Sequence, residues 1–293
     1  MNTRPSNRLR ETIRQGNLAL GTCIYSFSPA IIELAGFCGL DFCRIDNEHA
    51  WRQDHTIEDV IRGGLLAELV PLLRVDRDNP YLIRKALEAG AGGVIIPHAH
   101  DWQDVQGMVE AAKFPPLGRR GYGGLCLSGQ WGVDAGEEWM AWSNREQLVI
   151  PMIEDVTALG EIDAIMATTG VDGVFFGPAD FSISAGVALQ TGHEKVISAV
   201  KKVVEAADKY GKFVIYPVGF PQPNIVPISD KTSAASANSQ WLWRFFRPWP
   251  TCIRMTSRPA NGCFVKPSSQ RMNSSKRTIT KSASGVPIPE PLL

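Results

Sequence analysis

The sequence predicts an α/β fold of the (β/α)8 TIM-barrel class, and three observations carry that prediction. Short apolar runs alternate with longer amphipathic stretches from about residue 20 to residue 218. The runs are apolar throughout, as expected for parallel strands that are covered on both faces. Polar residues that could support catalysis follow several runs instead of one, whereas an open doubly wound sheet gathers its site at one switch point. A closed barrel therefore accounts best for the pattern.

The individual elements follow from these runs and from the residues that punctuate them. The predicted strands cover residues 21–26, 41–47, 70–75, 93–97, 148–153, 173–177 and 213–218. Proline in a first turn and glycine just past a last turn are typical helix boundaries. On this basis helices are predicted over 29–38, 56–69, 80–89, 102–113, 158–168 and 193–210. Residues 115–144 are Gly-rich and aromatic, which indicates a functional βα loop with a short helix inside it.

The chain divides into two parts of opposite charge. Residues 1–216 contain 20 Lys/Arg and 28 Asp/Glu, and residues 217–293 contain 10 Lys/Arg and 2 Asp/Glu. We therefore divide the chain into a barrel domain, 1–219, and an atypical basic segment, 220–293, that is rich in Ser, Pro and Trp. Two interpretations of this segment stay open, a disordered or partner-binding tail and a stretch produced by a shifted reading frame, and we favour the second. An eighth strand and a C-terminal helix are not legible in it.

Composition also excludes several classes of function. The excess of acidic residues in residues 1–216 argues against nucleic-acid binding, which usually needs a basic face. No run of 18 apolar residues exists and no secretory signal is evident, so we expect no membrane partner and a cytoplasmic location. The six cysteines form no CxxC pair and no Cys/His metal spacing, which fits small buried residues in a reducing compartment.

Two acidic residues have matching positions next to apolar runs. Glu154 and Asp180 each come just after a predicted strand, at the end where an α/β barrel places its chemistry. Two such carboxylates can hold one hard divalent cation and leave positions for water or substrate. The structural alternative is that each caps a loop or a helix.

Other polar residues precede this pair at similar positions. Asp46 and His49 follow the second strand, Arg74 ends the third, and Glu88 lies in the next helix. The segment Gly177-Pro178-Ala179-Asp180 offers the N–H groups of Ala179 and Asp180 to a small carboxylate. Alone, His49 reads as a hydrogen-bonded structural residue and Arg74 as an ion-pair partner of Glu48 or Asp76. His98 and His100, two residues apart, would point in opposite directions in an extended segment, and we interpret both as loop residues.

An ordered series of short motifs resembles the HpcH/HpaI family of class II pyruvate aldolases between about Gly21 and Gly219. The series is Asp-x-Glu-His, a strand-end Arg, Leu-Glu-Ala-Gly-Ala, Ile-Pro, Pro-Pro-x-Gly-x-Arg-Gly, Ile-Glu and Gly-Pro-Ala-Asp-Phe-Ser. The resemblance implies retro-aldol cleavage of a 4-hydroxy-2-oxo acid to pyruvate and an aldehyde. It also implies a divalent cation (Mg²⁺, Mn²⁺ or Co²⁺) and a homohexamer.

The resemblance also implies a role for each residue. Glu154 and Asp180 match the metal ligands, and Arg74 matches the arginine that binds the keto oxygen and stabilises the enolate. His49 matches the residue that moves the 4-hydroxyl proton through water. Asp46 matches a further acid near the site, and Glu88 matches an acid that pairs with the histidine, often from a neighbouring subunit. The cradle Gly177, Pro178, Ala179 and Asp180 matches the site of the pyruvate carboxylate.

Chemistry supports the same interpretation without the family. Cleavage beside a ketone leaves an enolate, which a cation and an arginine can stabilise. A Schiff-base lysine would need a lysine on a strand, and the seven predicted strands carry none.

Met152 replaces the glutamine that the family commonly has two residues before the metal-binding glutamate. A decarboxylase of an oxaloacetate-like acid and a catalytically inactive family member stay as alternatives.

Overall fold

The computed structural model describes residues 5–50, 54–77, 79–217 and 250–255. All of them belong to one compact unit, Met1–Arg258, and the second unit, Pro259–Leu293, lies outside the described residues. No helix in the described part of the chain is both long enough and apolar enough to span a membrane. The predicted division of the chain at residue 219 falls in the range that is not described and stays a prediction.

Seven parallel strands form a curled sheet, and all seven lie where the sequence predicts them to within two residues. They are β1 (Ala19–Ile24), β2 (Phe42–Asp46), β3 (Val70–Arg74), β4 (Gly93–Ile96), β5 (Leu148–Ile153), β6 (Gly173–Phe176) and β7 (Phe213–Pro217). Every residue of β2 to β6 is buried, which explains why these runs lack alternation.

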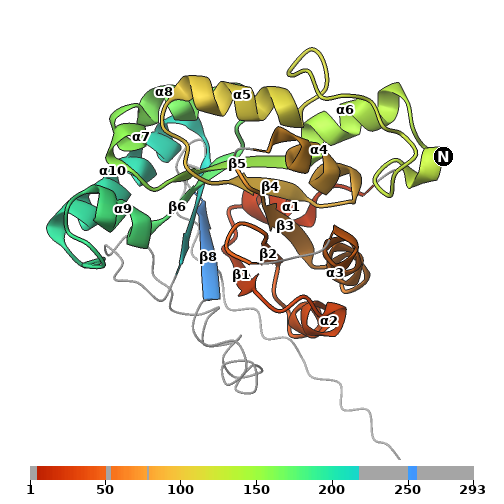
Figure 1. Cartoon of the computed structure of the whole chain (residues 1–293), viewed down its shortest axis with the longest axis horizontal. Helices are drawn as coiled ribbons and strands as arrows, with labels where there is room; N and C mark the ends of the chain where they lie inside the picture. The colour runs from red at the N-terminus through yellow and green to blue at the C-terminus, as the bar shows by residue number, and fades with distance from the viewer. Residues whose placement is uncertain (1–4, 51–53, 78, 218–249, 256–293) are drawn as a thin grey trace, which may run out of the picture. The chain divides into compact units, whose positions relative to one another are not determined.

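The eighth position of the sheet departs from the predicted (β/α)8 architecture. The strand β8 (Pro250–Met255) pairs with both β1 and β7, and it runs antiparallel to each of them. The order β1 to β8 is therefore closed, with seven parallel strands and one reversed strand (Figure 1). A (β/α)8 barrel needs a parallel eighth strand, so the described residues support a TIM-like barrel of seven parallel strands.

Helices cover the outer side of the sheet, with the exception of α1 (Figure 1). The helices of the described residues are α1 (Arg8–Arg14), α2 (Pro29–Phe37), α3 (Asp54–Leu66), α4 (Pro80–Glu88), α5 (Trp102–Ala112), η1 (Gln130–Gly132), α6 (Glu137–Glu146), α7 (Val156–Gly160), α8 (Ile162–Ala167), α9 (Pro178–Ser184) and α10 (Glu194–Tyr210). The sequence predicts α2 to α5, the pair α7 and α8 as one helix, and α10. It anticipates a short helix in the long loop and misses α1 and α9.

The apolar core has an outer and an inner part. Side chains between the strands and the helices form the larger cluster. The smaller cluster fills the inside of the sheet with side chains such as Phe42, Ile150 and Phe175. Leu9 and Ile13 of α1 belong to the inner cluster, so α1 packs against the interior residues of the strands. This packing leaves the carboxyl ends of the parallel strands for polar residues.

Candidate active site

The polar residues singled out in the sequence lie at the carboxyl ends of neighbouring strands. Asp46 is the last residue of β2, Arg74 is the last of β3, and Glu154 directly follows β5. Asp180 lies in the first turn of α9, which begins two residues after β6. Because these strands are parallel, their carboxyl ends share one rim of the barrel.

A buried ion pair links the ends of β2 and β3. The Arg74 guanidinium donates from Nη2 to Asp46 Oδ2 and from Nε to Asp46 Oδ1, the latter at 3.2 Å. Asp46 is fully buried, and Arg44 Nη2 lies 3.6 Å from its Oδ2. Burial raises the pKa of Asp46, but the charges of Arg74 and Arg44 outweigh burial and hold that pKa below its ordinary value. Asp46 therefore stays ionised and fixes the direction of Arg74.

Glu48 extends this pair toward the mouth of the barrel. Arg74 Nη1 lies 2.8 Å from Glu48 Oε2, which confirms the ion pair that the sequence offered as a structural role for Arg74. His98 Nε2 lies 3.0 Å from the other oxygen of Glu48. Glu48 thus joins the arginine at the end of β3 to a histidine from the loop after β4.

Glu154 is a buried carboxylate with an unusual electrostatic setting. Its side chain is 2 % exposed, and its Oε1 accepts from the backbone N–H of His98 at 2.6 Å. Burial raises the pKa of Glu154, the contacts with His98 lower it, and the charges of Asp180 and Glu48 raise it further. The net effect is a raised pKa, which means that the surroundings disfavour the charged carboxylate of Glu154. A cation bound nearby would stabilise that charge.

The chain approaches Glu154 closely at Gly177. A β-carbon at this position would lie 2.9 Å from both Cβ and Oε2 of Glu154, and 3.5 Å from Cε of Met152. Only glycine leaves room for the carboxylate there, so Gly177 has a steric role in the site. Met152, in the position where the family commonly has glutamine, is buried and apolar beside this contact.

The residues present fit a divalent cation. Around this rim the described residues place four carboxylates, those of Asp46, Glu48, Glu154 and Asp180, with two guanidiniums, those of Arg44 and Arg74. Two negative charges are therefore left in excess when His98 is neutral. No group of three or more His, Cys, Asp and Glu side chains is arranged as metal ligands among the described residues. Two carboxylates with water and substrate completing the shell suit Mg²⁺, which keeps several waters.

His49 lies in the loop after β2, and the segment 177–180 joins β6 to the first turn of α9. His49 is exposed at the mouth, its N–H donates to Asp46 Oδ1 at 3.2 Å, and its Nε2 lies 3.8 Å from Glu48 Oε2. The N–H groups of Ala179 and Asp180 belong to the first turn of α9, where amides lack acceptors within the helix. The carboxylate cradle and the proton-transfer role stay predictions.

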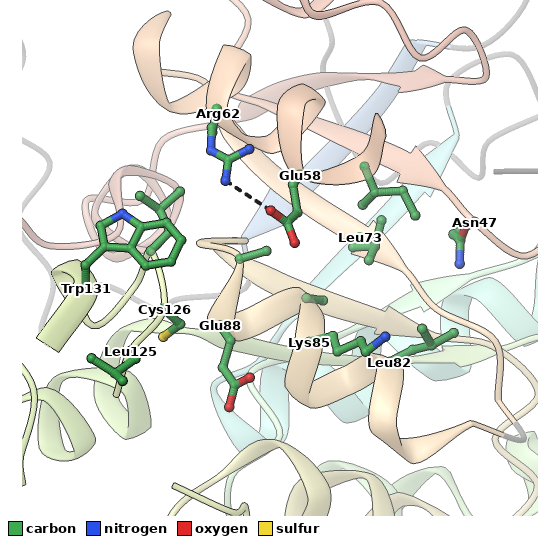
Figure 2. Close-up of a pocket in the computed structure, with 14 residues that line it drawn as sticks. Asn47, Glu58, Arg62, Leu73, Leu82, Lys85, Glu88, Leu125, Cys126 and Trp131 are labelled. Carbon is green, nitrogen blue, oxygen red and sulfur yellow. Dashed lines mark hydrogen bonds and ion pairs between the residues drawn. The ribbon is translucent and has the colours of Figure 1, made fainter. Parts of the chain in front are cut away.

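Glu88 lies apart from this rim. It ends α4 and lines a pocket of about 230 Å³ between α3, α4 and the long loop, together with Leu125, Cys126 and Trp131 (Figure 2). Arg84 Nε is 3.9 Å from Glu88 Oε1. Burial raises the pKa of Glu88, against the charges of Arg120 and Arg84. The predicted pairing of Glu88 with a histidine, which in the family often comes from a neighbouring subunit, stays a prediction.

His98 is the site residue that the sequence interpretation missed. Its ring connects Glu48 to Glu154, where Nδ1 lies 3.2 Å from Glu154 Oε1. His98 does lie in a loop, as the sequence predicts, but its φ of 54° is in the left-handed region, so the condition of an extended segment does not hold for it. The signal that was available is its position two residues after the fourth apolar run.

Comparison with known proteins decides the family. The model of the HpcH/HpaI aldolase/citrate lyase family matches residues 21–220. The chain belongs to this family. Among its relatives is a 2-keto-3-deoxy-L-rhamnonate aldolase of Klebsiella pneumoniae subsp. pneumoniae, which is 33% identical over 221 residues, or 73% of this chain and 81% of the relative. A protein of the same name from Salmonella gallinarum is 31% identical over 72% of this chain and 79% of its own length.

Solved structures show the same fold. An HpcH/HpaI aldolase/citrate lyase family protein from Burkholderia cenocepacia is similar with a TM-score of 0.69 and 27% identity, over 83% of this chain and 97% of that one. The citrate synthase SbnG is similar with a TM-score of 0.66 and 30% identity, over 81% and 86%. Both solved structures are therefore similar to this chain over most of its length.

Proposed function

We propose that this protein is a class II aldolase, a metal-dependent carbon–carbon lyase that cleaves a 4-hydroxy-2-oxo acid to pyruvate and an aldehyde. The observation that carries the proposal is the continuous network Asp46–Arg74–Glu48–His98–Glu154 at the carboxyl ends of the strands. This network places the fixed guanidinium of Arg74 and the buried carboxylate of Glu154, which a cation would stabilise, at one rim of the barrel. The aldolases among the relatives support the same reaction class.

Each residue has a defined part in this reaction. Glu154 and Asp180 would hold the divalent cation, which when bound supplies a Lewis acid for the keto oxygen of the substrate. Arg74, oriented by Asp46 and Glu48, stabilises the negative charge that develops on that oxygen. His49 takes the proton of the 4-hydroxyl group through water as the C3–C4 bond breaks. The aldehyde leaves, and protonation at C3 of the enolate gives pyruvate.

The names of the relatives suggest the first substrates. Both curated relatives are 2-keto-3-deoxy-L-rhamnonate aldolases, so 2-keto-3-deoxy sugar acids are the substrate class that we propose for this chain. The cation is proposed to be Mg²⁺, Mn²⁺ or Co²⁺, the location cytoplasmic, and the assembly a homo-oligomer of the hexameric kind. We propose further that the fold derives from a complete (β/α)8 barrel.

The test is a product assay on the full chain. With Mg²⁺ or Mn²⁺, 2-keto-3-deoxy-L-rhamnonate is expected to release pyruvate, which lactate dehydrogenase reports, and EDTA is expected to stop the release. Oxaloacetate is tested in parallel, since its decarboxylation passes through the same enolate. Pyruvate from oxaloacetate alone would favour the decarboxylase. A cooperatively folded sample that is inert with every substrate and metal would favour an inactive family member.

A further inference from the structure

We propose that His98 is a positioning residue that fixes the orientation of Glu154, one of the two residues that would hold the divalent cation. The inference rests on the proposed function, because it assigns a role toward the metal site. It concerns one side chain in the loop after β4 that none of the family motifs includes and that the sequence analysis interprets only as a loop residue. Its support is geometric and comes from three contacts.

The first two contacts converge on one oxygen of Glu154. The backbone N–H of His98 donates to Oε1 at 2.6 Å, and Nδ1 of the same residue lies 3.2 Å from that oxygen. The left-handed backbone of His98, with φ of 54°, turns both groups toward Glu154. A non-glycine residue in this region is strained, and such strain is often found at functional sites. Oε1 is thereby occupied by His98.

The other oxygen is left on the side where a ligand would bind. Glu154 Oε2 faces Gly177, since a β-carbon built on that residue would lie 2.9 Å from it. Asp180, the second predicted ligand, lies three residues further along and its charge acts on Glu154. Holding Oε1 therefore leaves Oε2 on the side of Gly177 and the start of α9, the helix that carries Asp180.

The third contact anchors the ring from the opposite side. His98 Nε2 lies 3.0 Å from Glu48 Oε1, and Glu48 is held by Arg74 at 2.8 Å. The imidazole is thus fixed between two carboxylates, and through Glu48 its position depends on the arginine that faces the enolate. Residues that hold a metal ligand in this way typically contribute 10- to 100-fold in metal affinity.

His100 supplies a matched control. It lies two residues further along the same loop, its side chain is 48 % exposed against 47 % for His98, and its Nδ1 lies 2.7 Å from Asp155 Oδ2. Asp155 caps α7 by accepting from the N–H of Ala158, and we assign it no metal. Substitution of His100 thus removes a histidine–carboxylate contact of the same kind on Asp155, the residue that follows Glu154, without touching Glu154 itself.

The experiment is a direct titration of the full chain with Mn²⁺, followed by the electron paramagnetic resonance signal of free Mn²⁺. The variants are His98→Ala, His98→Gln, His100→Ala and Glu154→Gln, each checked for a cooperative thermal transition. Alanine keeps a β-carbon, so the backbone strain and the N–H contact are retained and only the ring is lost. Glutamine offers an N–H to Glu154 again.

His98→Ala is expected to raise the Kd for Mn²⁺ by about 10- to 100-fold, with His98→Gln closer to the wild type and His100→Ala unchanged. A Kd in His98→Ala equal to that of the wild type, while Glu154→Gln loses binding, would overturn the inference and leave the proposed function standing. An equal loss in His100→Ala would also overturn it, as a general effect of the loop. A wild-type chain that binds no Mn²⁺ would overturn the proposed metal site itself.

Discussion

Arg74 lies between two carboxylates, and this arrangement sets the chemistry of the rim at the scale of single residues. Asp46 accepts hydrogen bonds from two nitrogens of the Arg74 guanidinium, and the third nitrogen forms an ion pair with Glu48. A planar guanidinium can hydrogen-bond Asp46 through two nitrogens and still place its third nitrogen beside Glu48, whereas an ammonium group cannot reproduce this fork. The direction in which Arg74 presents its charge to a substrate therefore depends on the guanidinium shape as well as on the charge.

Arg74→Lys is expected to lower kcat/KM for pyruvate release by about 100- to 1000-fold, the range typical of losing one preorganised donor. Arg77→Lys is the control, since Arg77 forms a partly exposed ion pair with Asp104 at 2.8 Å in the loop that follows β3. Partly exposed ion pairs of this kind contribute little to protein stability, and Arg77 has no part in the proposed site. Steady-state kinetics on both variants checks the prediction, and equal losses in the two would contradict it.

Asp46→Asn is expected to lower the free energy of unfolding at neutral pH by about 3 kcal/mol, because a buried partner of Arg74 loses its charge. The folded pKa of Asp46 is lowered, so its contribution is present above the unfolded pKa of about 3.9 and is lost as the pH falls through the lower folded value. Wild type and variant should therefore converge in stability as the pH falls below about 4.

Denaturant titrations at a series of pH values between neutral and acidic measure this convergence. A stability difference that stays constant down to the acid limit would show that the Asp46 charge is not its source.

Residue-level prediction from sequence succeeded where a side chain sits directly at a strand end. Asp46, Arg74 and Glu154 were placed at the rim because strand ends can be read from apolar runs, and the structure brings them into one network. His98 was missed because its contact depends on a left-handed backbone, which no local pattern in the sequence indicates. Glu48 was anticipated only as an ion-pair partner for Arg74.

At the scale of elements, the junction of β6 and α9 brings the chain against Glu154. Gly177 permits this contact because it has no β-carbon. A β-carbon there would lie too close to atoms of Glu154 and would contact Met152. The loop after β4 approaches the same carboxylate from the other side through His98. Glu154 is thus positioned by two elements that come from different strands.

Gly177→Ala is expected to displace Glu154 and to lower both metal affinity and activity, with a stability loss of about 1–3 kcal/mol from overpacking. Gly107→Ala in the middle of α5 is the control, because a β-carbon there meets nothing within 4 Å and should stabilise by about 1 kcal/mol. Thermal unfolding and Mn²⁺ titration measure both effects. Full metal affinity in Gly177→Ala would show that the close approach has no role in the site.

Element prediction followed the strength of the local signals. Buried parallel strands give continuous apolar runs, and long helices such as α10 give clear periodicity and a glycine stop at Gly211. The helices α1 and α9 have seven residues each, which is too short for a period to be evident. The strand β8 was not predicted because it lies in a basic, Pro-rich sequence that shows no strand period, and its direction is set by pairing with β7 and β1.

At the scale of the whole molecule, closure of the sheet depends on a single strand from the atypical segment. The pairs β7–β8 and β8–β1 occupy both edges that would otherwise be open. No eighth strand was legible in the sequence of this segment. The structure instead fills the position with an antiparallel strand, so the contribution of that strand can be measured.

A chain that ends at residue 219 is expected to aggregate or to lose its cooperative thermal transition. Without β8, the backbone groups of β1 and β7 are left unpaired along two sheet edges, which are templates for association. Size-exclusion chromatography with light scattering compares the truncated and full chains. A truncated chain as stable and monodisperse as the full one would show that β8 does not contribute to the fold.

The most direct test of the central claim is whether this site forms the enolate of pyruvate. In deuterated water with Mg²⁺, the full chain is expected to exchange the methyl protons of pyruvate for deuterium, which proton NMR follows as loss of the methyl signal. Exchange should stop with EDTA and in Glu154→Gln, and it should slow in Arg74→Lys. Exchange that is equally fast in EDTA or in Glu154→Gln, or no exchange by the wild type, would contradict a metal-dependent aldolase site built on Glu154 and Arg74.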